Sequence, residues 1–141
     1  MENQSTEIAK PLVSEKIAVQ EINNWLDARK VRQRSRIESQ IQINTLVDEV
    51  MEGTLTVGPD LYIKHKLLEP IVSDKGDIIL SEIVYQPRVK VESIITSTKI
   101  TDPKAYVLGY AAAITNTSAS MLAKLETTDY RILSAITGFF M

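Results

Sequence analysis

The chain has 141 residues, of which 44% are hydrophobic and 24% charged, and sixteen basic against eighteen acidic side chains give a net charge of -2. This composition is typical of a globular protein and argues against a disordered chain or a nucleic-acid binder that depends on overall positive charge. Cysteine is absent, which excludes disulfides, thiolate metal sites and a cysteine nucleophile. No run of about 18 apolar residues occurs in the sequence, so no transmembrane helix is expected.

The chain begins with a polar segment that leads into a helix. Residues 1–13 contain Pro11, which interrupts any early helix, and they are predicted to form a flexible tail. A helix is predicted over 14–28, because Ser14 is a favourable N-cap and apolar residues follow at intervals of three and four. The residues on this apolar face are Ala18, Ile22, Trp25 and Leu26.

A second helix is predicted over 36–52. Ser35 and Glu38 have the spacing of a capping box, and Gly53 stands where a glycine commonly ends a helix. The apolar residues of this helix are Ile43, Leu46, Val47, Val50 and Met51. The two helices together predict a helical hairpin arm over 14–53.

The pattern then changes to the two-residue period of β-strands. A short strand is predicted over 54–57, followed by a hairpin that runs from 61–72 to 77–86. The turn between its strands has the sequence Ser-Asp-Lys-Gly-Asp, and Pro87 ends the second strand. The middle of the chain therefore predicts a small antiparallel sheet.

The chain beyond this sheet is predicted to be helical. Helices are expected over 89–97, 103–115 and 130–140, with a capped turn between the last two. The predicted N-caps are Asp102 for the 103–115 helix, Ser118 for the turn, and Thr128 or Asp129 for the final helix. The sequence thus predicts an α+β fold with an N-terminal helical hairpin, a small antiparallel sheet and a C-terminal helical bundle, in which 54–141 form the main domain.

Few residues could support catalysis. His65 lies between Lys64 and Lys66 on a predicted strand, and we expect it to be solvated, because no set of three or four metal ligands accompanies it. No G-x-S-x-G elbow and no glycine-rich phosphate loop occurs. Asp74 and Asp77 are accounted for by a tight turn. We therefore expect no catalytic residues, no metal and no cofactor, and the chain is not expected to be an enzyme.

A cluster of cations separates the two predicted N-terminal helices. Its members are Arg29, Lys30, Arg32, Arg34 and Arg36. Such a cluster can contact phosphates, although the link lacks the short length and the glycine of a helix–turn–helix. Two interpretations stay open. One is a solvated loop, which the net negative charge favours, and the other is a nucleic-acid contact in a DNA-binding or head–tail structural protein.

The C-terminal part is strongly apolar and ends in Phe139, Phe140 and Met141. Burial of each such side chain is worth roughly 1.5–3 kcal/mol, so leaving all three in water is costly. One interpretation places Phe140 in the core, and the other has the final helices offer an apolar knob or groove to a partner helix. The candidate partner-binding residues are Met121, Tyr130, Leu133, Ile136, Phe139, Phe140 and Met141.

The second half of the chain also carries short motifs in a defined order. They are Leu67-Leu68-Glu69-Pro70-Ile71, then Gly76-Asp77-Ile78-Ile79, then Ile83-Val84-Tyr85-Gln86-Pro87-Arg88-Val89, and a closing series of Leu125, Asp129-Tyr130, Leu133, Ile136 and Phe139-Phe140. In order and spacing this half, about 67–141, resembles the small tail assembly chaperones of long-tailed phages. Residues 1–53 depart from the compact pattern of that family.

The resemblance implies a non-enzymatic protein that binds the tape measure protein and keeps its apolar helical segments soluble while the tail tube polymerises. It also implies the tail tube protein as a further partner, the host cytoplasm as the location, and absence from the mature virion. We expect homo-oligomers, because small chaperones with apolar surfaces often self-associate, and no nucleic-acid or membrane partner. The alternatives are the DNA-binding or head–tail structural protein and a virion tail subunit.

Overall fold

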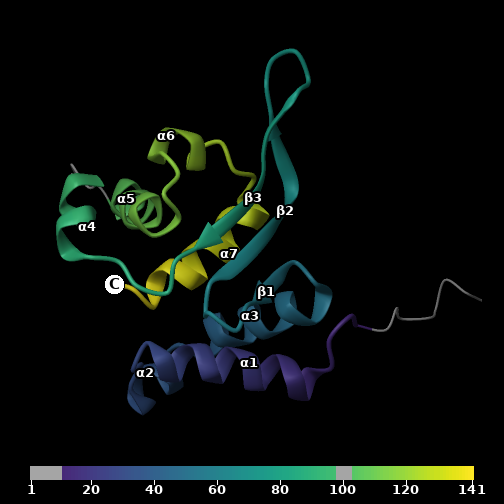
Figure 1. Cartoon of the computed structure of the whole chain (residues 1–141), viewed down its shortest axis with the longest axis vertical. Coiled ribbons are helices and arrows are strands. Elements are labelled where there is room, and N and C mark those ends of the chain that lie inside the picture. The colour runs from purple at the N-terminus through teal and green to yellow at the C-terminus, as the bar shows by residue number, and fades with distance from the viewer. Residues whose placement is uncertain (1–10, 98–102) are drawn as a thin grey trace, which may run out of the picture.

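The computed structural model describes residues 11–97 and 103–141 (Figure 1). Its elements in chain order are α1 (Glu15–Ala28), α2 (Gln33–Glu38), α3 (Gln40–Glu52), β1 (Leu55–Val57), β2 (Ile63–Val72), β3 (Ile78–Tyr85), α4 (Val91–Ser97), α5 (Pro103–Thr115), α6 (Ala119–Leu122) and α7 (Thr127–Gly138). The strands form one antiparallel sheet in the order β1-β2-β3. The N-terminal helices, this sheet and the C-terminal helices confirm the predicted α+β fold.

The first helix forms as its capping residue and apolar period predict. The Oγ atom of Ser14 accepts a hydrogen bond from the backbone N–H of Ile17 at 3.3 Å, and the four predicted apolar positions of α1 are buried. The chain just before α1 is attached to the end of α3, because Leu12 and Val13 donate backbone hydrogen bonds to the carbonyl of Met51. The predicted flexible tail therefore does not extend to these two residues, and its positions 1–10 lie outside the described residues.

The predicted second helix is divided into α2 and α3. The break lies at Ser39, whose φ of -106° and ψ of 25° depart from helical geometry. The predicted capping box is wrong, because Ser35 lies inside α2 and Arg32 occupies the N-cap position without a side-chain hydrogen bond. Gly53 ends α3 at a φ of 85°, in the left-handed region that glycine adopts at low cost, as predicted.

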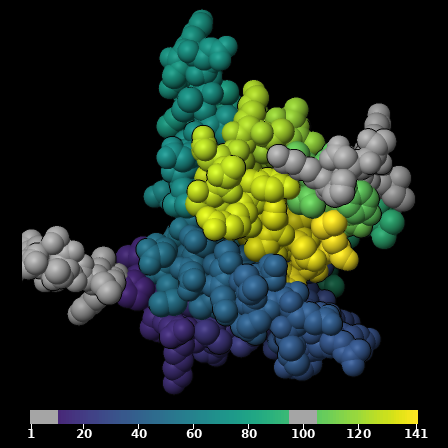
Figure 2. Space-filling view, turned by 180° about the vertical axis from the view of Figure 1, so that it is seen from behind, coloured from purple at the N-terminus to yellow at the C-terminus, as the bar shows by residue number. Residues whose placement is uncertain are grey.

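The hairpin of β2 and β3 has an interruption in its pairing. Lys66 is opposite Glu82 and Ile71 is opposite Leu80, so residues 67–70 of β2 stand against Ser81 alone. Beyond this bulge the end of the hairpin projects from the body of the molecule (Figure 1 and Figure 2). The exposed apolar side chains of this region are Leu68, Val72, Ile78 and Ile79.

The apolar faces of the helices and the sheet meet in one core. Helix α7 packs against α3, α5 and β2, and α3 packs in turn against α1 and β1. Trp25, Leu46, Ile63, Ile114 and Leu133 are all buried in the same cluster of side chains. The helices of 14–53 therefore share the core with the rest of the chain and do not form the separate arm that the sequence predicts.

The C-terminal helices begin close to where the sequence places them. The Oγ atom of Ser118 caps α6 by accepting from the N–H of Met121 at 3.2 Å, as predicted, while the predicted cap Asp102 lies outside the described residues. The predicted start of the final helix is wrong, because α7 begins at Thr127 and Glu126 holds the N-cap position. Asp129 lies in the first turn, so its side chain can bond to another element.

Candidate functional site

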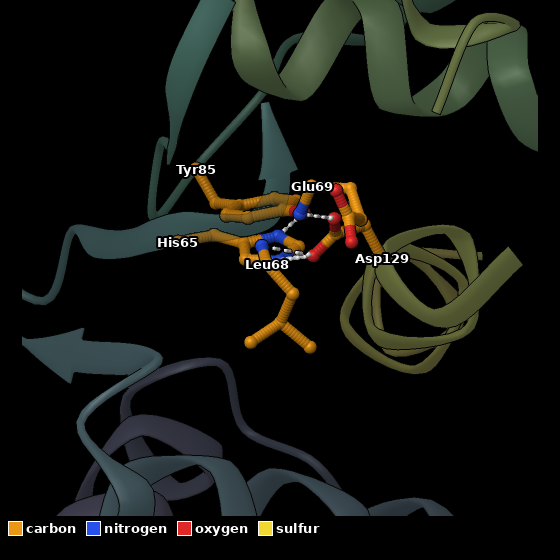
Figure 3. Close-up of polar contacts among 5 residues, drawn as sticks. All are labelled: His65, Leu68, Glu69, Tyr85 and Asp129. Carbon is orange, nitrogen blue, oxygen red and sulfur yellow. Dashed lines mark hydrogen bonds and ion pairs between the residues drawn. The ribbon is translucent and has the colours of Figure 1, made fainter. Parts of the chain in front are cut away.

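Three buried polar side chains meet between the sheet and α7 (Figure 3). Nδ1 of His65 lies 2.9 Å from the hydroxyl of Tyr85, and its Nε2 lies 3.1 Å from Oδ1 of Asp129. None of the three residues is exposed. The prediction of a solvated His65 is wrong, because the two-residue period of β2 places it on the inward face between Ile63 and Leu67. That alternation is the sequence signal that could have located it.

Asp129 also binds the backbone of β2. Its Oδ1 accepts from the N–H of Leu68 and its Oδ2 from the N–H of Glu69, both at 3.0 Å (Figure 3). These amides lie in the bulge, where β2 has no regular pairing with β3. The carboxylate thus accepts hydrogen bonds from two amides that have no partner in the sheet. These hydrogen bonds in turn offset the free-energy cost of burying the carboxylate.

The protonation of the cluster follows from burial. Burial lowers the pKa of His65, and the hydrogen bond and negative charge of Asp129 offset only part of that effect. Burial, and then the charge of Asp129, raise the pKa of Tyr85 well above its usual value. We therefore assign a neutral imidazole that donates from Nε2 to Asp129 and accepts at Nδ1 from the hydroxyl of Tyr85. With no exposed atom, this cluster joins α7 to the sheet and gives a substrate no access.

A surface hollow with a mostly apolar lining lies among α5, α6 and the start of α7. We name it the apolar hollow. Its volume is about 340 Å³, and its lining residues are Ala105, Leu108, Leu122, Ala123, Leu125, Thr127 and Tyr130. Tyr130, half-buried, is the one predicted partner-binding residue among those seven.

Two of the other predicted partner contacts are wrong. Leu133 and Ile136 are fully buried, because the helical period turns them toward the core rather than toward solvent. Met121 is half-buried against the core, and Met141 is 52% exposed. The apolar pattern of α7 therefore identifies the face of the helix that packs in the core. Which of its side chains remain exposed depends on the other elements that pack against this face.

The two C-terminal phenylalanines pack against α1. The rings of Phe139 and Phe140 each lie 6.0 Å from the ring of Trp25, centroid to centroid. The guanidinium of Arg29 stacks 3.5 Å above Phe140 and donates to the carbonyls of Pro87, at 2.6 Å, and Phe139. This arrangement favours the interpretation that Phe140 belongs to the packing of the domain.

A larger groove lies beside this contact. We name it the cationic groove, and its volume is about 1130 Å³. Its charged lining residues are Arg29, Lys30, Arg88 and Lys90, and its apolar lining includes Val89, Val91, Tyr110, Ala112, Ala113 and Phe140. Among the described residues that line it, none is acidic.

The predicted basic cluster does not form one surface. Arg29 and Lys30 line the cationic groove, whereas Arg36 forms an ion pair with Asp27 at 2.7 Å. Arg32 and Arg34 are exposed and line neither hollow nor groove. The other cations that line the groove with Arg29 and Lys30 are Arg88 and Lys90, which come from the segment after β3.

Within residues 11–97 and 103–141, no three His, Asp or Glu side chains come together as a metal site would require. The helices of the same ranges are all too short or too polar to traverse a bilayer. Comparison with protein-family models, with curated proteins and with solved structures gives no match to this chain.

Proposed function

We propose that this chain is a phage tail assembly chaperone that binds apolar helical segments of a tape measure protein. In this role it keeps the tape measure protein soluble in the host cytoplasm while the tail tube assembles, performs no reaction, and leaves before the virion is mature. The observation that carries the proposal is the apolar hollow, in which Leu108, Leu122, Leu125 and Tyr130 surround a space open at the surface. The resemblance of the second half of the chain to that family also supports the proposal.

The chemistry of the hollow suits a reversible cover for a helix. Aliphatic side chains from a partner helix would gain roughly 0.8 kcal/mol for each methylene that enters the hollow. A volume of about 340 Å³ accepts one or two such side chains and not a whole helix. Affinity at this level permits later displacement by tube subunits, because dissociation becomes fast when few contacts hold a complex.

Asp129 and Tyr130 have separate roles in this proposal. The carboxylate of Asp129 fixes the first turn of α7 to the bulge of β2. That attachment positions Tyr130, the next residue, at the apolar hollow. In the Asp-Tyr pair of the closing motif, Asp129 therefore attaches the helix to the sheet, and Tyr130 faces the partner.

The experiment that tests the proposal is co-expression with a tape measure protein from the same genome. We expect a soluble complex that is recovered by affinity purification of either protein. Ala123→Glu places a charge at an exposed position of the hollow and should reduce recovery of the complex about tenfold, the equivalent of about 1.4 kcal/mol. Ser120→Glu adds the same charge three positions earlier, at an exposed position of α6 outside the hollow, and should leave recovery unchanged.

Two outcomes count against the proposal. Equal recovery with the two variants would remove the apolar hollow as the binding site. Detection of the chain in purified virions, in stoichiometric amounts, would favour a tail subunit over a chaperone that leaves.

A further inference from the structure

The cationic groove gathers like charges from two distant parts of the chain. Arg29 and Lys30 follow α1, while Arg88 and Lys90 lie between β3 and α4. The hydrogen bond from Nη1 of Arg29 to the carbonyl of Pro87, at 2.6 Å, holds the two segments together. In Figure 1 the C-terminal end of the chain lies beside the segment that links β3 to α4. A defined contact between the two segments therefore fixes the positions of these charges.

These cations lack an anionic counterpart within the part of the chain that the structure describes. No acidic residue is among the described residues that line the groove, and Lys30, Arg88 and Lys90 form no ion pair there. The burial of Arg29 and the positive charge of Arg88 lower the pKa of Arg29 from its usual value. Such a like-charge arrangement costs free energy that a bound anionic group would recover.

The rest of the lining argues for a helix as the bearer of that negative charge. Val89, Tyr110, Ala112, Ala113 and Phe140 add apolar side chains to the lining that holds the cations. The volume of about 1130 Å³ is on the order of that of two turns of α-helix about 10 Å wide. An amphipathic helix satisfies both features, because its apolar stripe can contact the apolar side chains while acidic residues beside the stripe contact the cations.

A nucleic acid fits these features less well. Arg29 is already engaged by two backbone carbonyls and the ring of Phe140, which leaves Lys30, Arg88 and Lys90 to contact phosphates. Phosphate contacts supply essentially all of the non-specific affinity for duplex DNA, and three cations can make only a few of them. The apolar side chains of the lining would also be left without an apolar partner against the charged backbone of the nucleic acid.

We propose that the cationic groove binds an amphipathic helical segment of a protein partner, with glutamate or aspartate along the edges of its apolar stripe. This inference goes beyond the proposed function, because it assigns a second binding surface, of different chemistry, whose ligand is defined by charge. It holds whether or not the apolar hollow binds a tape measure protein.

The test measures binding of a labelled peptide to the full chain by fluorescence anisotropy. The probe is a synthetic helix of about 18 residues, five turns, with leucine on one face and glutamate along its edges. A matched peptide has glutamine in place of every glutamate. We expect the acidic peptide to bind at least tenfold more tightly than its matched control, and its affinity to fall as salt is added.

Charge-reversed variants locate the site. Arg88→Glu with Lys90→Glu should weaken binding of the acidic peptide at least tenfold, since both side chains are exposed at the groove. Arg32→Glu with Arg34→Glu makes the same change of charge at the same spacing, on exposed residues outside the groove, and should retain affinity. Lys30→Glu is a second groove variant, from the other chain segment, and circular dichroism checks the folding of each variant.

Four results would overturn the inference. The first is that the acidic peptide does not bind, and the second is that the groove variants and the Arg32/Arg34 control weaken its binding equally. The third is that duplex DNA displaces the peptide and itself binds more tightly. The fourth is a dimer of the wild-type chain that disappears in the groove variants, which would make a second copy the occupant.

Discussion

Oδ1 of Asp129 lies 3.1 Å from Nε2 of His65, so the first turn of α7 is joined to the middle of β2 across 64 residues of sequence. The same carboxylate binds two backbone amides in the bulge of β2. The bulge leaves these part-buried amides without a partner in the sheet, and the carboxylate supplies one. Apolar packing also holds the C-terminal helix against the sheet, and Asp129 adds three hydrogen bonds between these two elements.

Asp129→Asn should destabilise the fold. The amide keeps the size of the side chain but loses the charge and one acceptor, and its NH2 group faces donors. We expect the free energy of unfolding to fall by about 1–3 kcal/mol, measured by urea denaturation. Asp74→Asn, at an exposed turn position, is the matched control and should change stability by less than about 0.5 kcal/mol. Equal effects of the two substitutions would contradict the assigned role.

Stability should fall on mild acidification through His65. Its pKa in the folded state lies below the unfolded value of about 6.5, so the unfolded chain binds more protons as the pH falls through that range. The free energy of unfolding should therefore decrease below about pH 6.5, with a slope of at most about 1.4 kcal/mol per pH unit from this group. His65→Gln should weaken the pH dependence between pH 7 and 5, and an unchanged slope would show that other groups cause it.

Arg29→Lys should reduce the stability of the fold more than the exchange of one cation for another usually does. Its guanidinium donates to the carbonyls of Pro87 and Phe139 and stacks on Phe140, and a lysine ammonium cannot make these contacts together. We expect a loss of about 1–3 kcal/mol in urea denaturation. Arg34→Lys, an exposed position of α2, should be close to neutral.

Replacement of the two C-terminal rings should unfold the domain before it reveals a binding defect. Phe139 and Phe140 both contact Trp25, which is only 1% exposed. Phe139→Ser with Phe140→Ser should lower the free energy of unfolding by several kcal/mol, on the order of the 3–5 kcal/mol found for one fully buried ring. Near-wild-type stability of this double variant would return both rings to the list of partner contacts.

The sequence by itself determines where most elements begin and end. The apolar period of α1, the cap of Ser14, the left-handed Gly53 and the alternation of β2 each act within a few residues, so local rules are enough to predict them. The same rules mislead where a polar side chain has a choice of partner. Asp129 can cap its own helix or reach another element, and only the packing of α7 on β2 decides between them.

The tertiary structure alone decides which residues are available to a partner. Leu133 and Tyr130 belong to one apolar helix, yet the first is sealed in the core and the second lines the apolar hollow. Lys30 and Arg88 are 58 positions apart and become neighbours through the contact of Arg29 with Pro87. The physical reason is that several segments, brought together by folding, determine how deeply a side chain is buried and which charges surround it. The periodic pattern of one segment carries information about that segment alone.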